Sequence, residues 1–144
     1  MKLLLLALVI FISSPEEKIK IKDPWMRISA EGQSTALFMK IENTGDVADT
    51  LYKAECDFAG RVEIHETYQQ GEMMGMREVP FIVIPPKSTF ELKPRSHHIM
   101  VIKLKKDIKK GTQEEFTLYF KQAGKLKVKA TAQEMQMPKM EHKH

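Results

Sequence analysis

Two histidines and two methionines recur in a fixed order in the middle of the chain. Ten residues separate His65 from Met76, twenty-one separate Met76 from His98, and one separates His98 from Met100. Imidazole and thioether are soft ligands, and soft ligands select Cu(I) over the hard cations that prefer oxygen. Zinc prefers thiolate, imidazole and carboxylate, so the methionines argue against a zinc site. The four side chains therefore predict a Cu(I) site.

The strands expected around these residues would bring them together. Alternate side chains of a strand share one face, so we expect His98 and Met100 to project together. The same alternation turns Ile64 to the core and leaves His65 on the outer face or at the strand end. Met76 falls in a Gly-punctuated segment, which we interpret as a loop that folds over the strand ends. The four ligands can then converge at one rim of the fold.

Neighbouring side chains offer alternatives to these ligands. His97 is adjacent to one predicted ligand, but alternation places it on the opposite face. Met73 and Met74 lie in the same Gly-punctuated segment and could replace the predicted methionine there. Glu63 and Glu66 flank the first histidine, either as solvated residues or as hydrogen-bond partners of a ligand.

The rest of the chain alternates short apolar and polar runs between turn residues. No segment holds a helical period, so we expect an all-β fold, an antiparallel Greek-key sandwich or barrel. Asp23-Pro24 should separate the first two strands, and Trp25 should enter the core. The expected strands cover residues 18–22, 25–28, 35–41, 50–56, 61–65, 81–84, 89–92, 98–104, 115–121 and 125–131.

Length, charge and the two ends of the chain suggest an exported single domain. The 144 residues carry a formal net charge of +4 with Lys and Glu interspersed, which argues against a nucleic-acid partner. Residues 1–14 combine a lysine with an apolar run and predict a secretory signal peptide. The run is too short to span a bilayer, so no stable membrane insertion is expected after its removal. Residues 15–132 would form the domain, and residues 133–144 a flexible tail.

Export implies an oxidising compartment, where a single cysteine has no internal partner. Cys56 is therefore expected to be a small core residue or a half-buried thiol. Methionine in place of cysteine would keep a copper site out of thiol–disulfide exchange.

At the four predicted ligands the chain resembles the periplasmic copper chaperones of the PCuAC type, whose His-x10-Met-x21-His-x-Met signature it fits without a gap. The resemblance extends over residues 18–131 and includes segments 23–27, 43–45 and 62–66. It implies a cupredoxin-like fold and a carrier of Cu(I) in the periplasm. The implied partners are the copper subunit of cytochrome c oxidase and a thioredoxin-like copper-assembly protein. One departure is Pro94-Arg95-Ser96-His97, where family members usually carry Pro-Gly-Gly; its bulk and charge bear on the shape of the loop.

Some members of this family carry a Met- and His-bearing extension that binds a second copper ion, and the tail resembles it. Histidines there could hold Cu(II), while thioethers favour Cu(I). The alternative is a polar tail that chelates metal incidentally. The residues concerned are Met135, Met137, Met140, His142 and His144.

Two other functions are compatible with the expected fold. An electron-transfer cupredoxin needs a cysteine thiolate beside two histidines and a weak axial methionine, and no Cys-x-His-x-Met loop occurs. A metal-free interaction module is the second alternative. An enzyme is not expected, because neither a nucleophile–base order nor a carboxylate pair at a site is evident.

Overall fold

The computed structural model describes residues 17–135, and these residues form strands without a helix. The all-β prediction is therefore confirmed. The predicted signal peptide and all but the first residues of the predicted tail lie outside the described residues. No apolar helix of membrane-spanning length occurs between residues 17 and 135. The strands are β1 (Ile19–Arg27), β2 (Thr35–Asn43), β3 (Asp49–Glu55), β4 (Ala59–Gln70), β5 (Met73–Glu78), β6 (Ile82–Ile84), β7 (Ser88–Leu92), β8 (His97–Leu104), β9 (Gln113–Phe120) and β10 (Gly124–Gln133).

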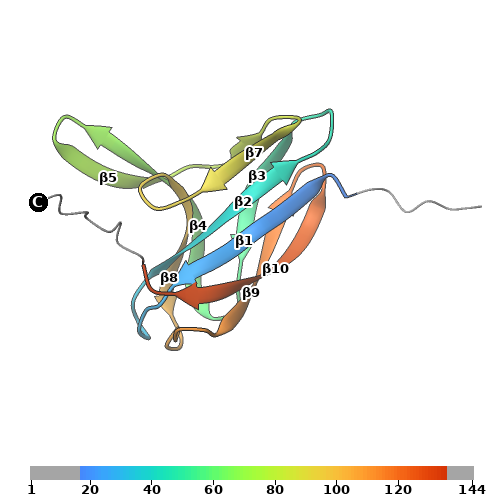
Figure 1. Ribbon diagram of the computed structural model, residues 1–144. Helices are drawn as coiled ribbons and strands as arrows, with labels where there is room; N and C mark the ends of the chain where they lie inside the picture. Colours follow the sequence, from blue (N-terminus) through green and yellow to red (C-terminus); the bar gives the residue numbers. More distant parts are fainter. Residues whose placement is uncertain (1–16, 136–144) are drawn as a thin grey trace, which may run out of the picture.

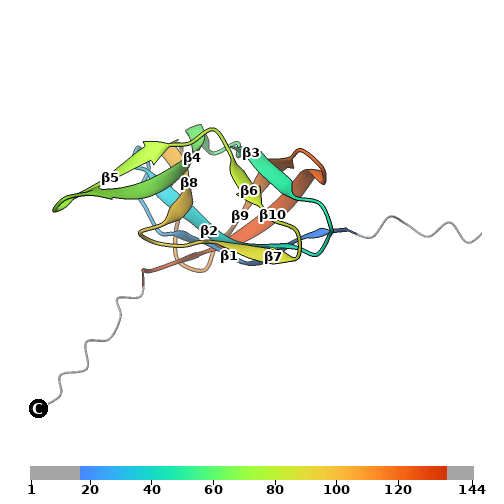
Figure 2. The ribbon, with the colours of Figure 1, turned by 90° about the horizontal axis from the view of Figure 1, so that it is seen from above.

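The strands hydrogen-bond in the order β5-β4-β8-β2-β1-β10-β9-β3-β6, and β7 pairs with β2 beside β8. The sheet curls on itself, so that β1, β2 and β7 form one layer and β3, β6 and β9 face them (Figure 2). The hairpin of β4 and β5 extends beyond the two layers (Figure 1). Its base is therefore an exposed rim of the sandwich.

The core lies between the layers and consists of the inward side chains of every long strand. Alternation in β2 sends Leu37, Met39 and Ile41 inward, all of them at most 2% exposed. Their partners come from the facing layer and include Leu51, Ile84, Phe116, Leu118 and Phe120. Burial of this much apolar surface is the main driving force for folding.

The first strand differs from the prediction in three ways. Asp23-Pro24 does not end it, because β1 continues through a bulge where its pairing with β2 shifts between Lys22 and Trp25. Asp23 absorbs the irregularity with a φ of 51°, a conformation that Asp tolerates better than most residues. Trp25 is half-buried and lies outside the core, where its ring packs on Phe38 at 4.6 Å between centroids. The pairing of β1 with β10 is parallel, whereas the prediction was antiparallel throughout.

The segment of Met76 is also not a loop. It is strand β5, which pairs with β4 through a two-residue turn at Gly71-Glu72. Gly71 has a φ of 61°, which such turns require. A Cβ at Gly75 would lie 2.7 Å from the Tyr68 ring, so the missing side chain lets this ring lie across the hairpin. The guanidinium of Arg77 lies 4.8 Å from the centroid of the same ring.

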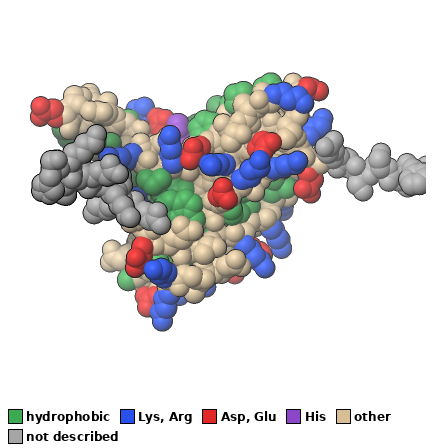
Figure 3. Space-filling view, in the orientation of Figure 1, with side chains coloured by type: hydrophobic (Ala, Val, Ile, Leu, Met, Phe, Trp, Pro, Cys, Tyr) green, Lys and Arg blue, Asp and Glu red, His purple; other side chains and the backbone are tan. Residues whose placement is uncertain are grey.

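Charged side chains of both signs are interspersed on the face that carries β1, β2 and β7 (Figure 3). Ion pairs such as Lys40–Asp23, at 3.9 Å, connect some of them. A continuous basic surface of the kind that binds nucleic acid is not visible on this face.

Candidate metal centre

Strand register brings the four predicted ligands to one face of the sheet. His65 on β4 pairs with His98 on β8, and Met100 pairs with Glu63 two residues along. On the other side of β4, Met76 pairs with Thr67. Since paired residues share a face, as do alternate residues, the two imidazoles and two thioethers all project from the face opposite the core.

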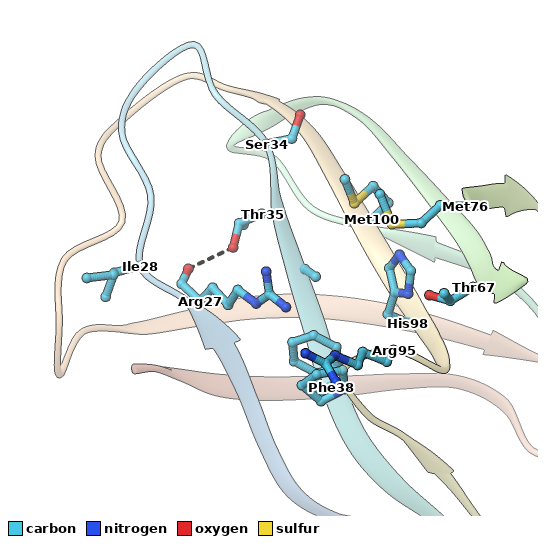
Figure 4. Close-up of a pocket in the computed structure, with 12 residues that line it drawn as sticks. Arg27, Ile28, Ser34, Thr35, Phe38, Thr67, Met76, Arg95, His98 and Met100 are labelled. Atoms are coloured by element: carbon cyan, nitrogen blue, oxygen red, sulfur yellow. Dashed lines mark hydrogen bonds between the residues drawn. The ribbon is translucent and has the colours of Figure 1, made fainter. Parts of the chain in front are cut away.

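A pocket of about 250 Å³ opens on this face. Met76, His98 and Met100 line it together with Phe38 and Thr67. The thioethers of Met76 and Met100 point toward each other beside the His98 ring (Figure 4). His65 does not line the pocket but lies next to it, with its ring centroid 5.7 Å from that of His98. The structure therefore gathers three predicted ligands in one cavity and the fourth at its side.

The ring of His98 is held with one nitrogen free. Its Nδ1–H donates to the carbonyl of Ser96 at 3.1 Å, and that carbonyl also accepts the backbone N–H of Thr67. Nε2 is buried and has no hydrogen-bond partner. Because a carbonyl can only accept, Nδ1 must carry the proton and Nε2 the lone pair in the neutral ring. Metal-binding histidines are oriented in the same way, by donation of the second ring N–H to a carbonyl or carboxylate.

Burial keeps His98 in that neutral form. The residue is 4% exposed, and desolvation lowers the pKa of its imidazole below the usual value. The hydrogen bond to Ser96 acts in the opposite direction, and the nearby ring of His65 lowers the pKa further. A neutral imidazole with a free lone pair is the form that binds a metal ion.

The ring of His65 is held by a carboxylate. Its Nε2 lies 2.7 Å from Oε2 of Glu63, and its Nδ1 is buried without a partner. Glu63 in turn accepts from Nε of Arg61 at 2.6 Å. The two carboxyl oxygens are thus both engaged, and Glu63 is a hydrogen-bond partner of the predicted ligand rather than a solvated residue. In His65 the free atom is Nδ1, and in His98 it is Nε2.

The alternative ligands lie elsewhere. His97 is on the opposite face, as predicted, where its ring packs on Phe90 at 5.1 Å and Nε2 lies 3.4 Å from Glu66. Met73 pairs with Gln70 and is turned away from the pocket by alternation, whereas Met74 shares the face of Met76 two pairs nearer the hairpin tip. Neither lines the pocket.

In the described part of the chain, oxygen and thiolate ligands do not offer a competing site. Within residues 17–135, no three His, Cys, Asp or Glu side chains gather closely enough to hold a metal ion. Cys56 precedes β4, and the six residue steps of strand from Ala59 to His65 span about 20 Å. Of the predicted tail ligands only Met135 is described, and it is 47% exposed. The other four, Met137, Met140, His142 and His144, lie outside the described residues.

Two arginines at this pocket were not among the residues predicted from the sequence. Arg27, at the end of β1, and Arg95, in the turn before β8, both line it. Arg27 Nε is buried without a hydrogen-bond partner. The unusual Arg95 was visible in the sequence as a departure from the family pattern, but its position beside the ligands was not.

Comparison with known proteins identifies the class of domain. Residues 19–132 match a family described as "Putative lipoprotein LpqE-like". Among curated proteins, the uncharacterized protein RP573 of Rickettsia prowazekii (strain Madrid E) is 27% identical over 110 residues, which cover 73% of this chain. The matched region spans 61% of the length of that relative.

Solved structures give the same class of domain. The apo PCuAC domain from PmoF1 is 27% identical, with a TM-score of 0.71 over 82% of this chain and 95% of that one. The copper-bound PCuAC domain from PmoF2 is 27% identical, with a TM-score of 0.70 over 82% and 94%. The Cu(I) form of DR1885 from Deinococcus radiodurans is 26% identical, with a TM-score of 0.64 over 82% and 81%. The predicted cupredoxin-like β fold is thereby confirmed.

Proposed function

The chain belongs to the LpqE-like family and is of the PCuAC type, and on that premise we propose that it binds one Cu(I) ion and carries it to an acceptor outside the cytoplasm. Two of its structural relatives are named as copper-bound forms, one of them with Cu(I). These relatives support a role as a copper-binding domain of the chaperone type.

The proposed ligands are Nδ1 of His65, Nε2 of His98 and the thioether sulfurs of Met76 and Met100. The observation that carries this assignment is the pair of orphaned ring nitrogens. A buried polar atom without a partner costs free energy, and these two atoms lie on adjacent strands beside two thioethers. A soft cation would satisfy both.

The ligands differ in exposure in a way that suits transfer. His98 is 4% exposed, Met100 is half-buried, and Met76 is 55% exposed at the base of the hairpin. An incoming ligand of an acceptor could replace the outermost thioether first, while the buried imidazole still holds the ion. Cu(I) tolerates the three-coordinate geometry that such an exchange passes through.

The destination of the copper is inferred from the family resemblance. We propose the copper centre of cytochrome c oxidase as the acceptor, with a thioredoxin-like assembly protein as a partner. A periplasmic or other extracytoplasmic location agrees with the family description as a lipoprotein. Copper is the cargo in this proposal, and the protein does no chemistry on it.

An electron-transfer role is less well supported. The estimated 20 Å of strand between the start of β4 and His65 leaves Cys56 too far from the pocket to supply a thiolate. A strongly coloured Cu(II) form would favour electron transfer, and a colourless Cu(I) form that resists air would contradict it.

The test is a titration of the apo protein with Cu(I) in competition with a chromophoric Cu(I) chelator. We expect tight 1:1 binding at the pocket. His98→Ala and Met100→Ala should each lower the Cu(I) affinity by at least tenfold, because loss of a residue that only hydrogen-bonds a metal ligand already costs roughly tenfold to hundredfold. His97→Ala, which changes the adjacent histidine on the opposite face, is the matched control. Unchanged affinity in both ligand variants would favour a metal-free interaction module.

A further inference from the structure

Three buried side-chain nitrogens of the described chain lack a hydrogen-bond partner, and all three lie at the candidate metal centre: Arg27 Nε, His65 Nδ1 and His98 Nε2. They are not of one kind. The two ring nitrogens offer lone pairs, which the proposed Cu(I) ion would accept. The guanidinium N–H of Arg27 is a donor, which a copper ion cannot satisfy. A cation therefore accounts for two of the three atoms and leaves the third in need of an acceptor.

Arg27 is held in place at the pocket. Its backbone carbonyl accepts the hydroxyl of Thr35 at 2.7 Å, and its guanidinium carbon lies 5.6 Å from the centroid of the Phe38 ring. Phe38 is 1% exposed, so the ring forms a fixed floor for the guanidinium. No Asp or Glu lines this pocket, and no ion pair to Arg27 occurs between residues 17 and 135.

A second arginine lines the same pocket from another element. Lys93 to Ser96 form a turn closed by a hydrogen bond from Ser96 N–H to the Lys93 carbonyl at 3.1 Å. Pro94 is its second residue and Arg95 its third, with a φ of 66°. Glycine is the residue that such a position favours, so an arginine there costs backbone free energy. The Arg95 side chain places a second positive charge at the rim of the pocket, again with no acidic partner in the described part of the chain.

The carboxylates nearest in the strand register are already engaged. Glu63 binds Arg61 and His65, and Glu66 binds Arg77 at 2.6 Å on the opposite face. Among the described residues, two arginines thus share a pocket with neutral predicted ligands and no negative charge.

We propose that Arg27 and Arg95 form a binding site for a carboxylate group, directly beside the copper ligands. Planar guanidinium groups pair with carboxylates through two parallel hydrogen bonds, and the hydroxyls of Ser34 and Thr67 at the pocket wall supply further donors. A volume near 250 Å³ admits a group of this size. The source is either a small free carboxylate or an Asp or Glu side chain of a docked protein, and the chemistry at the arginines is the same.

The carboxylate and the copper ion bind cooperatively, a consequence that rests on the proposed function. A negative charge in the pocket attracts the Cu(I) ion and offsets the repulsion by the two arginines. Coupling of this kind is reciprocal, so copper tightens the carboxylate as much as the carboxylate tightens copper.

The test of the site uses the apo form of the full chain and needs no copper. Acetate is titrated at constant ionic strength while the arginine Nε–H signals are followed by ¹H–¹⁵N NMR, with Arg27→Lys used to assign the Arg27 signal. We expect a saturable shift of that signal, and acetate binding about tenfold weaker in Arg95→Gly, as for loss of a hydrogen bond to a charged group. Inorganic phosphate serves as the competing anion.

Lys103→Gly is the matched control for Arg95→Gly. Lys103 also has a positive φ, of 56°, and its loss removes the same charge, but it lies outside the pocket. Acetate binding should be unchanged in this variant. An equal loss in both variants, no saturable shift, or tighter binding of phosphate than of acetate would each overturn the carboxylate site.

Two further experiments identify where the carboxylate comes from and whether its binding is coupled to copper binding. A capped Gly-Glu-Gly peptide is compared with its Gly-Gln-Gly counterpart: binding of the first alone supports a side-chain carboxylate, and binding of acetate alone supports a free one. The Cu(I) competition titration is then repeated with saturating acetate, where we expect a several-fold gain in affinity that Arg95→Gly abolishes. Acetate binding without copper binding would contradict the proposed function but not this site, and copper binding without acetate binding would do the reverse.

Discussion

The two histidines of the site are held by different partners, and this decides which ring nitrogen is free. In His98 a backbone carbonyl accepts the Nδ1 proton, and in His65 the Glu63 carboxylate lies against Nε2. Alternation in the sequence could predict that both rings share a face with Met100. It could not predict the free nitrogen of each ring, because that depends on Ser96 and Glu63 in three dimensions.

Glu63→Gln tests whether the carboxylate that holds the His65 ring contributes to copper binding. The change keeps the shape but removes the charge that orients and polarises the ring, so we expect Cu(I) affinity to fall by roughly tenfold. Glu66→Gln is the matched control, because Glu66 binds Arg77 and His97 on the other face. Competition titrations measure the Cu(I) affinity of both variants. Equal affinities would mean that Glu63 does not contribute to copper binding.

The pKa of His98 predicts how the stability of the apo protein depends on pH. Burial lowers the pKa of this imidazole in the folded state, so between the folded and unfolded pKa values only the unfolded chain binds the proton. The free energy of unfolding should therefore fall as the pH drops below about 6.5, by at most about 1.4 kcal/mol per pH unit from this residue.

Denaturant titrations between pH 7 and pH 5 measure this effect as the difference between the wild-type protein and His98→Gln. We expect the pH dependence to be shallower in the variant than in the wild-type protein. If the free energy of unfolding changed with pH equally in the wild-type protein and in His98→Gln, the imidazole of His98 would not be the cause of the pH dependence.

At the scale of elements, the β4–β5 hairpin decides which methionine lies at the candidate site. Its register places Met76 opposite Thr67 at the pocket and turns Met73 to the other face. The sequence showed glycines and methionines here and suggested a loop, because the alternation of β5 carries no core residue: all but one of its residues are exposed. A strand without a buried face leaves no hydrophobic pattern to recognise.

Met76→Leu and Met73→Leu test that register with an identical change. Leucine keeps the apolar volume and removes the thioether, so we expect Met76→Leu to weaken Cu(I) binding by at least about tenfold and Met73→Leu to leave it unchanged. Methyl NMR of labelled methionines gives a second measurement, in which Cu(I) should shift the Met76 signal and not the Met73 signal. The reverse pattern would mean that the hairpin is paired differently.

At the scale of the whole molecule, the sandwich supplies a rigid base for a site on its outer face. β2 carries core residues on one face and Ala36 and Phe38 on the other, so one buried strand serves both the core and the pocket floor. The fold class and most strands could be predicted from alternation and turn residues. The β1 bulge, the parallel β1–β10 pairing and the position of Arg27 could not, since each depends on which strands become neighbours.

The truncation that separates the pocket from the tail follows from this architecture. Gln133 pairs with Arg27 at the end of β10, so removal of every residue after Ala132 would disturb the pocket itself. A chain that ends at Met135 keeps this pairing and lacks four of the five predicted tail ligands. We expect it to bind the first Cu(I) equivalent as tightly as the full chain and to lose any second one, as measured by competition titration. A weaker first equivalent would mean that the tail contributes to the main site.

The most direct test of the copper site is X-ray absorption spectroscopy of the Cu(I)-loaded chain that ends at Met135. Two imidazole nitrogens and two thioether sulfurs around copper are the predicted result, with one sulfur lost in Met76→Leu and the other in Met100→Leu. A spectrum with nitrogen and oxygen neighbours but no sulfur would contradict it.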